Sequence, residues 1–265
     1  LGYWNKAGLA QYWSLRGGKS DLDRAIELQT EVVEMAREVG EVELGMSYSN
    51  LGSYQINRGL EDESLETFMR LVELQPENAV ALNNYAYVLA TSMNKPEEAL
   101  EYAVKAVRLD PSSLEILDTM ATIYGMLGRY DDSLSSRLRL HQLYPADLST
   151  LLAICDSYQR HMDDPAKAAE FAKLAMRVKP EDPRVLDAMG WASYRTGKKM
   201  EGEDLLRQSI RLGPTASAHL HLAQVFMQNG DLEMASEQLR LADDLAPDTE
   251  TKAEIDRLKD DIARS

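Results

Sequence analysis

The sequence predicts an all-α solenoid, a stack of helical hairpins related by a small constant rotation. Two sets of observations predict it. Six prolines recur at intervals of 33 to 35 residues: Pro76, Pro111, Pro145, Pro180, Pro214 and Pro247. A small residue lies twelve positions before each proline, and a second one lies twelve or thirteen positions earlier still. A joint period near 34 residues is typical of stacked helical hairpins.

The two sets of small residues divide each unit into two helices. The set in the first helix is Gly52, Ala86, Ala121, Cys155, Gly190 and Ala223, and the set in the second is Ser64, Ala99, Ser133, Ala168, Gly202 and Ala235. Breakers such as Asn57-Arg58-Gly59 separate the sets, and the proline ends the second helix. Antiparallel helices approach closely where both carry little side chain, so we expect both sets at the seam of each hairpin.

The units follow one another along the chain. Residues 1–44 resemble a divergent hairpin, with Leu9-Ala10 and Ala25 at repeat positions, extra residues Gly18 to Ser20 in its turn, and a second helix from Leu22 to about Val39. Six tandem units follow over 45–247, with bounds of about 45–78, 79–113, 114–147, 148–182, 183–215 and 216–248. Residues 249–265 are expected to form a charged amphipathic helix that caps one continuous solenoid, because a terminal hairpin otherwise exposes its apolar face.

Composition excludes several classes of partner. Lys plus Arg total 29 against 44 Asp plus Glu, and the net charge of −15 disfavours nucleic acid and anionic lipid, so a neutral to basic partner is expected. No apolar run is long enough to span a membrane and no leader pattern is visible, so we expect a soluble cytoplasmic or periplasmic segment without direct membrane insertion. The single cysteine excludes an intrachain disulfide. Oligomeric state stays open.

Motifs that carry chemistry are weak in this sequence. Gly17-Gly18-Lys19-Ser20 resembles the end of a phosphate-binding loop, but Trp13 stands where a glycine is required. His219 and His221 are two residues apart and fall on different faces of a helix, which argues against a shared metal. Cys155 occupies a seam position, where a free cysteine behaves as a small buried hydrophobe. We therefore expect no catalytic residue, no metal and no cofactor, and the chain is not expected to be an enzyme.

The units resemble tetratricopeptide repeats (TPR). The residues that carry the resemblance are Tyr124, Gly128, Tyr130, Ser133 and Pro145 in one unit and Gly190, Trp191, Tyr194 and Gly197 in another. The resemblance implies a right-handed superhelix whose first helices line a concave groove that binds other polypeptides. Residues 186–214 and 219–239 are also similar to bacterial repeat proteins of exopolysaccharide assembly and export.

Helical geometry selects the side chains that reach this groove. The small residue of each first helix points at its partner helix, so positions three and two before it, one after it and five after it share a face turned away from the seam. Chosen from the residues at these positions, the candidate partner-binding residues are Asn50, Ser53, Asn83, Asn84, Tyr87, Asp118, Thr122, Asp156, Arg160, Asp187, Trp191, Arg195, His221 and Gln224. Asparagine both donates and accepts, which suits the backbone of an extended peptide, whereas Tyr87 and Trp191 are typical interaction anchors.

Packing roles stay open for some of these residues. Asn50 and Asn84 are equally well explained by contacts between neighbouring first helices, and Trp191 by filling the interface beside it. Repeat proteins of this type that bind the acidic C-termini of chaperones use Asn and basic side chains on successive first helices. Here Glu115 and Thr119 stand where the basic residues are required, which disfavours a carboxylate ligand.

Two functions remain. The first is a protein–protein interaction scaffold whose concave groove binds a partner polypeptide within a multiprotein assembly or secretion machine. The alternative is the substrate-recognition arm of a larger enzyme, such as a glycosyltransferase, whose catalytic domain is absent from this chain.

Overall fold

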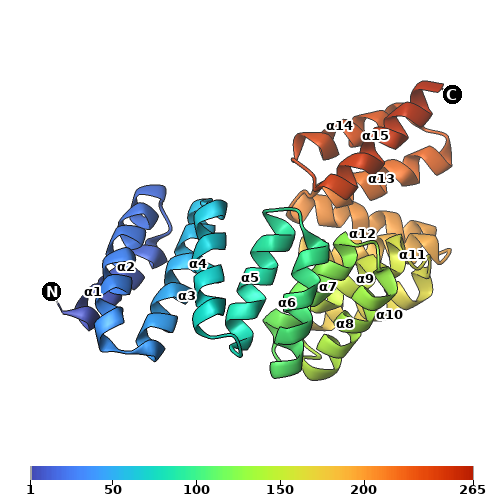
Figure 1. The fold of residues 1–265 in the computed structure, drawn as a ribbon. Coiled ribbons are helices and arrows are strands. Elements are labelled where there is room, and N and C mark those ends of the chain that lie inside the picture. Colours follow the sequence, from blue (N-terminus) through green and yellow to red (C-terminus); the bar gives the residue numbers. More distant parts are fainter. Residues whose placement is uncertain (1, 265) are drawn as a thin grey trace. The chain divides into compact units, whose positions relative to one another are not determined.

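The computed structural model describes residues 2–264, and every regular element in that range is an α-helix (Figure 1). The helices are α1 (Tyr3–Arg16), α2 (Lys19–Val39), α3 (Glu41–Arg58), α4 (Glu61–Leu74), α5 (Ala79–Thr91), α6 (Pro96–Leu109), α7 (Leu114–Met126), α8 (Tyr130–Leu143), α9 (Leu148–Arg160), α10 (Pro165–Val178), α11 (Pro183–Arg195), α12 (Lys199–Leu212), α13 (Ala216–Asn229), α14 (Leu232–Asp244) and α15 (Thr249–Arg264). Among them, none combines the length and the apolar character needed to cross a bilayer.

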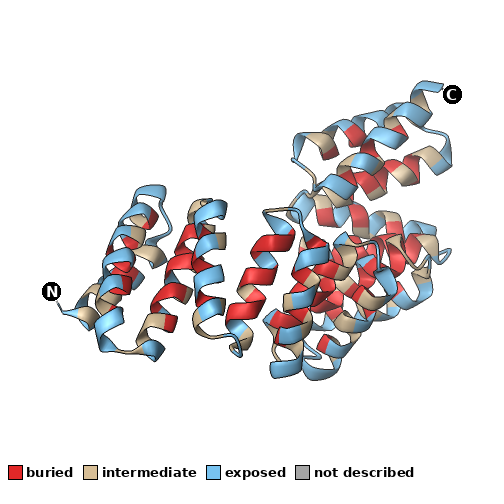
Figure 2. Cartoon of the chain, in the orientation of Figure 1, coloured by how far each residue is buried: buried red, intermediate tan, exposed pale blue. Residues whose placement is uncertain are grey.

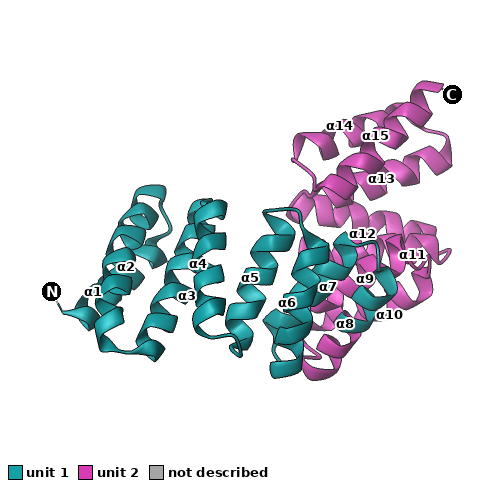
Figure 3. Cartoon of the chain, in the orientation of Figure 1, with its two compact units in different colours: residues 1–136 teal, residues 137–265 magenta. Residues whose placement is uncertain are grey.

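The chain divides into two compact units, residues 1–136 (unit 1) and 137–265 (unit 2), with the boundary inside α8 (Figure 3). Within unit 1, each helix from α1 to α7 packs against the next, and α5 also packs against α7. Within unit 2, the same order runs from α9 to α15, and the first helices α9, α11 and α13 lie side by side. This is the packing of an α-solenoid, in which each hairpin contacts its neighbours along the chain.

The small residues predicted at the hairpin seams are all buried there (Figure 2). A methyl group added to Gly202 would lie 2.6 Å from the backbone oxygen of Gly190, so neither helix of that hairpin has room for a larger residue. In two other hairpins a seam hydroxyl bonds across: Ser64 Oγ donates to the Gly52 carbonyl at 3.1 Å, and Ser133 Oγ donates to the Ala121 carbonyl at 2.7 Å. Close approach of the helices therefore depends on these positions.

A left-handed residue occupies the turn inside each of the six hairpins from α3 to α14. In four turns it is a glycine, including Gly59 (φ 81°) and Gly230 (φ 82°), because glycine adopts positive φ without steric cost. In the turns after α5 and α9 it is Asn94 (φ 52°) and Asp163 (φ 49°), short polar residues that tolerate this region better than most. The turn geometry thus repeats even where the glycine does not.

The N-terminal hairpin differs from its prediction at the turn. Lys19 and Ser20 were expected in an enlarged turn but form the start of α2, since Gly17 (φ 73°) ends α1 in the left-handed conformation and Gly18 is already the residue before the next helix. The extra length lies in the helices instead, because α2 has 21 residues and α3 has 18, whereas the later helices up to α14 have 13 or 14.

The helix α15 takes the place that a further first helix would occupy, packing against both α13 and α14. Its apolar face buries Ile255 and Leu258 against Leu220, Ala223 and Leu239. The opposite face is charged, with ion pairs such as Lys252–Asp256. An amphipathic helix of this kind covers the apolar face of the last hairpin, which is what a cap must do.

Candidate functional site

A groove in unit 1 is formed mainly by the first helices α3, α5 and α7. Its volume is about 350 Å³, and it is lined by Ser53, Ile56, Asn57, Phe68, Asn83, Asn84, Tyr87, Leu114, Glu115, Asp118 and Thr119. We call it the unit 1 groove. Five candidate residues from the sequence line it: Ser53, Asn83, Asn84, Tyr87 and Asp118. The other two unit 1 candidates do not: Asn50 is exposed on α3, and Thr122 is half-buried on α7.

Polar groups in the unit 1 groove differ in how well they are satisfied. Asn83 is only 6% exposed, and its Nδ2 lies 3.5 Å from Asn84 Oδ1 in a long hydrogen bond. The Oδ1 atom of Asn83 is buried and has no donor within the protein. Tyr87, by contrast, is 43% exposed. A buried acceptor without a partner costs roughly 1–3 kcal/mol. The Asn83 oxygen is therefore poised to accept a hydrogen bond from a bound group.

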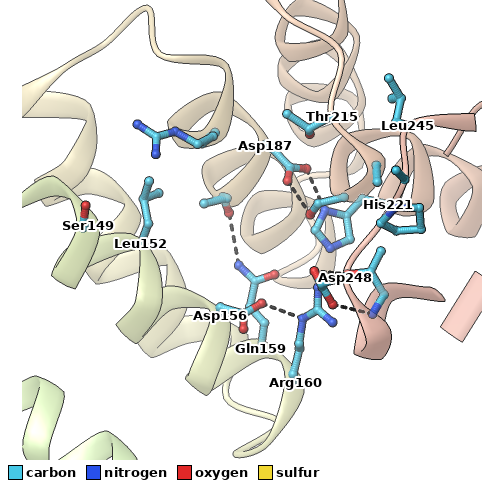
Figure 4. A pocket seen from close by; sticks show the side chains of 17 residues that line it. Ser149, Leu152, Asp156, Gln159, Arg160, Asp187, Thr215, His221, Leu245 and Asp248 are labelled. Carbon is cyan, nitrogen blue, oxygen red and sulfur yellow. Dashed lines mark hydrogen bonds and ion pairs between the residues drawn. The ribbon is translucent and has the colours of Figure 1, made fainter. Parts of the chain in front are cut away.

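Two hollows lie in unit 2 on the faces of α9, α11 and α13. The first, about 520 Å³, is lined by Ser149, Leu152, Asp156, Gln159, Arg160, Arg184, Asp187, Ala188, Thr215, Ala216, Ser217, His221, Leu245, Ala246, Pro247, Asp248 and Thr251 (Figure 4). The second, about 530 Å³, is lined by Gln159, Arg160, Trp191, Arg195, Leu220, His221, Gln224, Glu250, Ala253, Glu254 and Arg257. Together they contain all seven candidate residues of unit 2.

Asp187 is the centre of a hydrogen-bond network in the first hollow. Its Oδ1 lies 2.6 Å from His221 Nδ1, and its Oδ2 accepts from Ser217 Oγ at 2.7 Å (Figure 4). Both carboxylate oxygens therefore have hydrogen-bond partners within the protein, and Asp187 is only 6% exposed. Trp191 stacks on the His221 ring with centroids 4.8 Å apart. Asp187 therefore links α11 to α13 and orients the His221 ring. The stacked ring of Trp191, 8% exposed, packs against His221 and helps to hold it in place.

Arg160 and Arg195 join neighbouring first helices. Arg195 Nη1 donates to the carbonyl of Gln159 at 2.9 Å. Arg160 Nε donates to Asp156 Oδ1 at 2.6 Å, and its Nη2 donates to Thr251 Oγ1 at 3.2 Å. Burial opposes the charge of Arg160, but the carboxylates around it, that of Asp156 first, outweigh burial and raise the pKa of the guanidinium. Both arginines are charged groups held in place rather than mobile surface side chains.

The contribution of α15 and the turn before it to the unit 2 hollows was not predicted from the sequence. Residues of this segment line both unit 2 hollows, and Glu254 Oε1 accepts from Gln224 Nε2 at 3.1 Å. The signal was present, because α15 occupies the position of a first helix and its inward face follows the same helical phase. Residues 249–265 were predicted only as a capping helix, without a part in the groove.

The two units differ in charge. Residues 1–136 contain 22 acidic and 11 basic side chains, a net charge of −11, whereas residues 137–265 contain 22 and 18, a net charge of −4. The grooves follow the same trend. The unit 1 groove is lined by two acidic side chains and no Lys or Arg, whereas the unit 2 hollows combine carboxylates with four arginines.

The Cys155 thiol and the His219 ring are both engaged in contacts within unit 2. Burial raises the pKa of the Cys155 thiol to about 12, and its Sγ lies 3.5 Å from the Ala168 carbonyl oxygen. His219 Nδ1 pairs with Gln238 Oε1 at 2.8 Å, away from His221. Across residues 2–264, no three His, Cys, Asp or Glu side chains converge as the ligands of a metal ion would.

Known proteins similar to this chain include a tetratricopeptide repeat protein and a transferase. The tetratricopeptide repeat family matches residues 45–78, 79–113 and 188–249. The TPR repeat-containing protein PA4667 of Pseudomonas aeruginosa is 24% identical over 173 residues, which is 64% of this chain and 29% of that protein. Human protein O-mannosyl-transferase TMTC1 is 24% identical over 235 residues, 83% of this chain and 25% of that protein. The chain thus spans less than a third of the length of either relative.

Solved structures share the fold. A tetratricopeptide repeat protein from Parabacteroides merdae superposes with a TM-score of 0.73 at 16% identity, over 96% of this chain and 97% of that one. YrrB, a TPR protein with an unusual peptide-binding site, superposes with a TM-score of 0.52 at 20% identity, over 73% of this chain and 99% of that one. The recurring seams, the hairpin packing and these matches lead to one conclusion: the chain belongs to the tetratricopeptide repeat family.

Proposed function

We propose that this chain is a protein-interaction scaffold that binds a segment of a partner polypeptide along its first helices. The observation that carries the proposal is that twelve of the fourteen candidate residues on this helical face line hollows, five in unit 1 and seven in unit 2. Volumes of about 350 to 530 Å³ suit a few side chains of a bound segment. YrrB, which shares the fold, supports a peptide as the ligand.

In this proposal the chain binds a partner polypeptide and catalyses no reaction. Its one thiol is buried with a raised pKa, and the Asp187–His221 pair is bonded to Ser217 through the carboxylate, so the histidine is not positioned to take a proton from that hydroxyl. Folds of this kind typically serve as interaction surfaces. As part of this proposal, the partner polypeptide belongs to a multiprotein assembly or secretion machine.

Photo-crosslinking tests which surface binds. We place p-benzoylphenylalanine in turn at Tyr87, in the unit 1 groove, and at Gln228, an exposed residue beside Trp191. Leu212, which is exposed near the end of α12, a second helix, serves as the control position. A partner captured from positions 87 and 228, on first helices, and absent from position 212 supports the proposal. Capture at position 212 alone would instead place the binding surface on the second helices.

A second function rests on one specific match. The similarity to TMTC1 extends over 83% of this chain, which favours an arm that selects substrates for a transferase. The coding sequence on either side of these residues distinguishes the two functions. A transferase domain in the same reading frame supports the arm, whereas flanking segments without one support a separate scaffold.

A further inference from the structure

The face of α1 opposite its hairpin seam exposes three large apolar side chains. Trp4 is 67% exposed, Tyr12 53% and Leu15 81%. Together with Gly8 they follow a helical spacing of four, four and three residues, so they fall within one stripe along the helix. We call Trp4, Gly8, Tyr12 and Leu15 the α1 stripe. Apolar side chains that gather in one exposed patch mark an interaction surface, whereas single scattered ones do not.

Later first helices bury the position that Tyr12 occupies in α1. Tyr12 stands two residues after Ala10, the buried small residue of its helix. The residues at the same position in α3, α5, α7, α11 and α13 are all buried: Tyr54, Val88, Ile123, Ala192 and Val225. Tyr54 shares an apolar cluster with Leu28 of α2, the second helix of the preceding hairpin. The α1 stripe is therefore of the same kind as an interface that later hairpins form, but in α1 this position is open.

Gly8 lies in the middle of the α1 stripe and has no packing role within the chain. Glycine is unfavourable inside a helix, and a close approach of another group is the usual reason for its presence there. An added methyl group at any other glycine inside the helices of residues 2–264 would have a neighbour within 4 Å: Gly45, Gly52, Gly125, Gly190 and Gly202. At Gly8 it would meet no atom within that distance. A helix from outside the chain, crossing closely at Gly8, accounts for the glycine.

The α1 stripe is symmetrical about Gly8, and this symmetry identifies the partner. One aromatic residue stands four positions before Gly8 and another stands four positions after it. In a two-fold interface, residue i of one copy meets residue j of the other, and j meets i. If two α1 helices cross at Gly8 in opposite directions, Trp4 of each copy therefore meets Tyr12 of the other. Rows of residues four apart are also the ridges that interlock in the commonest class of helix packing.

Charge also favours a second copy at this face. The chain has a net charge of −15, so two copies repel each other over most of their surface. The α1 stripe carries no charge, and α1 contains no acidic residue. Its two basic side chains are already paired, Lys6 with Glu31 and Arg16 with Asp21. Contact through the α1 stripe therefore brings the two copies together without burying a charged group.

We propose that the chain forms a two-fold dimer in which α1 of one copy crosses α1 of the other at Gly8. Trp4 and Tyr12 pair across the axis, and Leu15 packs beside them. The open parts of two such stripes and their neighbours amount to roughly 700–1,000 Å², given about 150–250 Å² for a fully buried aromatic side chain. This is below the size of a stable interface, so we expect a reversible dimer with a Kd on the order of micromolar. The inference concerns assembly of the chain with itself and goes beyond the scaffold proposal.

Sedimentation velocity of the full chain, from low micromolar to several hundred micromolar, tests the dimer. We expect the sedimentation coefficient of the wild-type chain to rise from the monomer value to the dimer value over this range. Leu15→Ser should raise the dimer Kd about tenfold or more, because each copy loses a buried apolar side chain. The matched control is Leu212→Ser, the same substitution at a leucine of α12 that is 53% exposed, which should leave Kd unchanged.

Gly8→Leu distinguishes a close helix crossing from general stickiness of an apolar face. The space around Gly8 is open within one copy, and leucine is a better helix former than glycine, so the variant should not lower the melting temperature measured by circular dichroism. The larger side chain should hold the two helices apart and raise the dimer Kd about tenfold. An apolar face that associates without a defined crossing would instead bind more tightly with an added leucine.

Three results would overturn the inference. A chain that stays monomeric at every concentration has no such dimer. Association that is unchanged or tighter in Gly8→Leu refutes the crossing at this glycine. Association that weakens equally in Leu15→Ser and Leu212→Ser shows that the copies do not meet specifically at α1. None of these results bears on crosslinking from positions 87 and 228, so the scaffold proposal is tested separately.

Discussion

At the scale of single residues, the hairpin turns impose a backbone requirement that most side chains cannot meet. Asn94 has φ of 52° in an exposed turn, at the repeat position that four other hairpins fill with glycine. Left-handed geometry costs an ordinary L-residue roughly 1–2 kcal/mol, and asparagine less. The positions of glycine in the sequence do not reveal every turn that needs positive φ, because the turn geometry imposes that backbone angle whichever residue is present.

Substitution of Asn94 tests this requirement. We expect Asn94→Ala to lower the free energy of unfolding by about 1 kcal/mol, and Asn94→Gly to leave it unchanged or raise it slightly. Ser92→Ala is the control, since Ser92 is also exposed but has φ of −94°. Urea denaturation followed by circular dichroism measures all three. Equal effects of alanine at positions 92 and 94 would show that the left-handed geometry is not the constraint.

Asp182 predicts how stability responds to pH. The Arg184 side chain donates hydrogen bonds to the Asp182 carboxylate, with Nη2 2.9 Å from Oδ2. These bonds hold the pKa of the nearly buried Asp182 carboxyl well below its usual value. Because the folded-state pKa is depressed, the stabilisation is complete above the unfolded-state pKa of about 3.9 and is lost as pH falls below it.

The pH dependence is tested by Asp182→Asn, which retains a side chain able to cap α11. We expect the wild-type chain to lose stability more steeply than Asp182→Asn between about pH 4 and pH 2, and to be the more stable of the two at pH 7. Thermal melts across this range measure the difference. Parallel curves for the two proteins would mean that the ion pair with Arg184 contributes nothing measurable.

At the scale of elements, helical phase explains which side chains reach a groove, and this is why most of the candidate residues line one. Phase within a helix says nothing about partners on other helices. Asp187 is occupied by Ser217 and His221, which lie 30 and 34 residues away in the next hairpin. Arg160 meets Thr251 across 91 residues, a contact set by how successive hairpins rotate. These partners depend on angles between hairpins that a single sequence does not reveal.

The capping role of α15 yields a third prediction. Ile255 is fully buried against the apolar residues of α13 and α14, so Ile255→Ala leaves a cavity at the end of the stack. We expect a loss of about 2–5 kcal/mol in the stability of this end of the chain, with faster hydrogen exchange in α13, α14 and α15. Asp261→Ala, on the exposed side of α15, should change exchange little. Unchanged exchange in Ile255→Ala would show that α15 does not stabilise the hairpin before it.

At the scale of the whole molecule, the two units share one repeat but not one chemistry. The seams were predictable because each hairpin needs small residues at the same two positions, whatever it binds. Residues that face the groove or the solvent are not limited in this way and can differ in charge. Unit 1 has a net charge of −11 and unit 2 a net charge of −4, although both consist of the same helical hairpins. Repetition therefore preserves the architecture, while the groove-facing residues are free to differ between units.

A destabilising substitution in a repeat array should have a local effect. The stability of each hairpin depends on contacts within that hairpin and with its immediate neighbours. Ala168 is fully buried at the seam of the α9–α10 hairpin, next to Cys155. We expect Ala168→Leu to overpack this seam and cost about 1–3 kcal/mol. Hydrogen exchange should accelerate in α9, α10 and α11 and stay unchanged in α1 to α4.

The matched control for this experiment is Ala166→Leu, the same substitution at an exposed position on the same helix, which should alter exchange nowhere. Mass spectrometry of peptic fragments resolves the helices one by one. If Ala168→Leu accelerates exchange equally in α1 to α4, the chain unfolds as a single cooperative body and stability does not add up hairpin by hairpin. If it changes exchange nowhere, the seam has room for a larger side chain, and close approach of the paired helices does not depend on small residues.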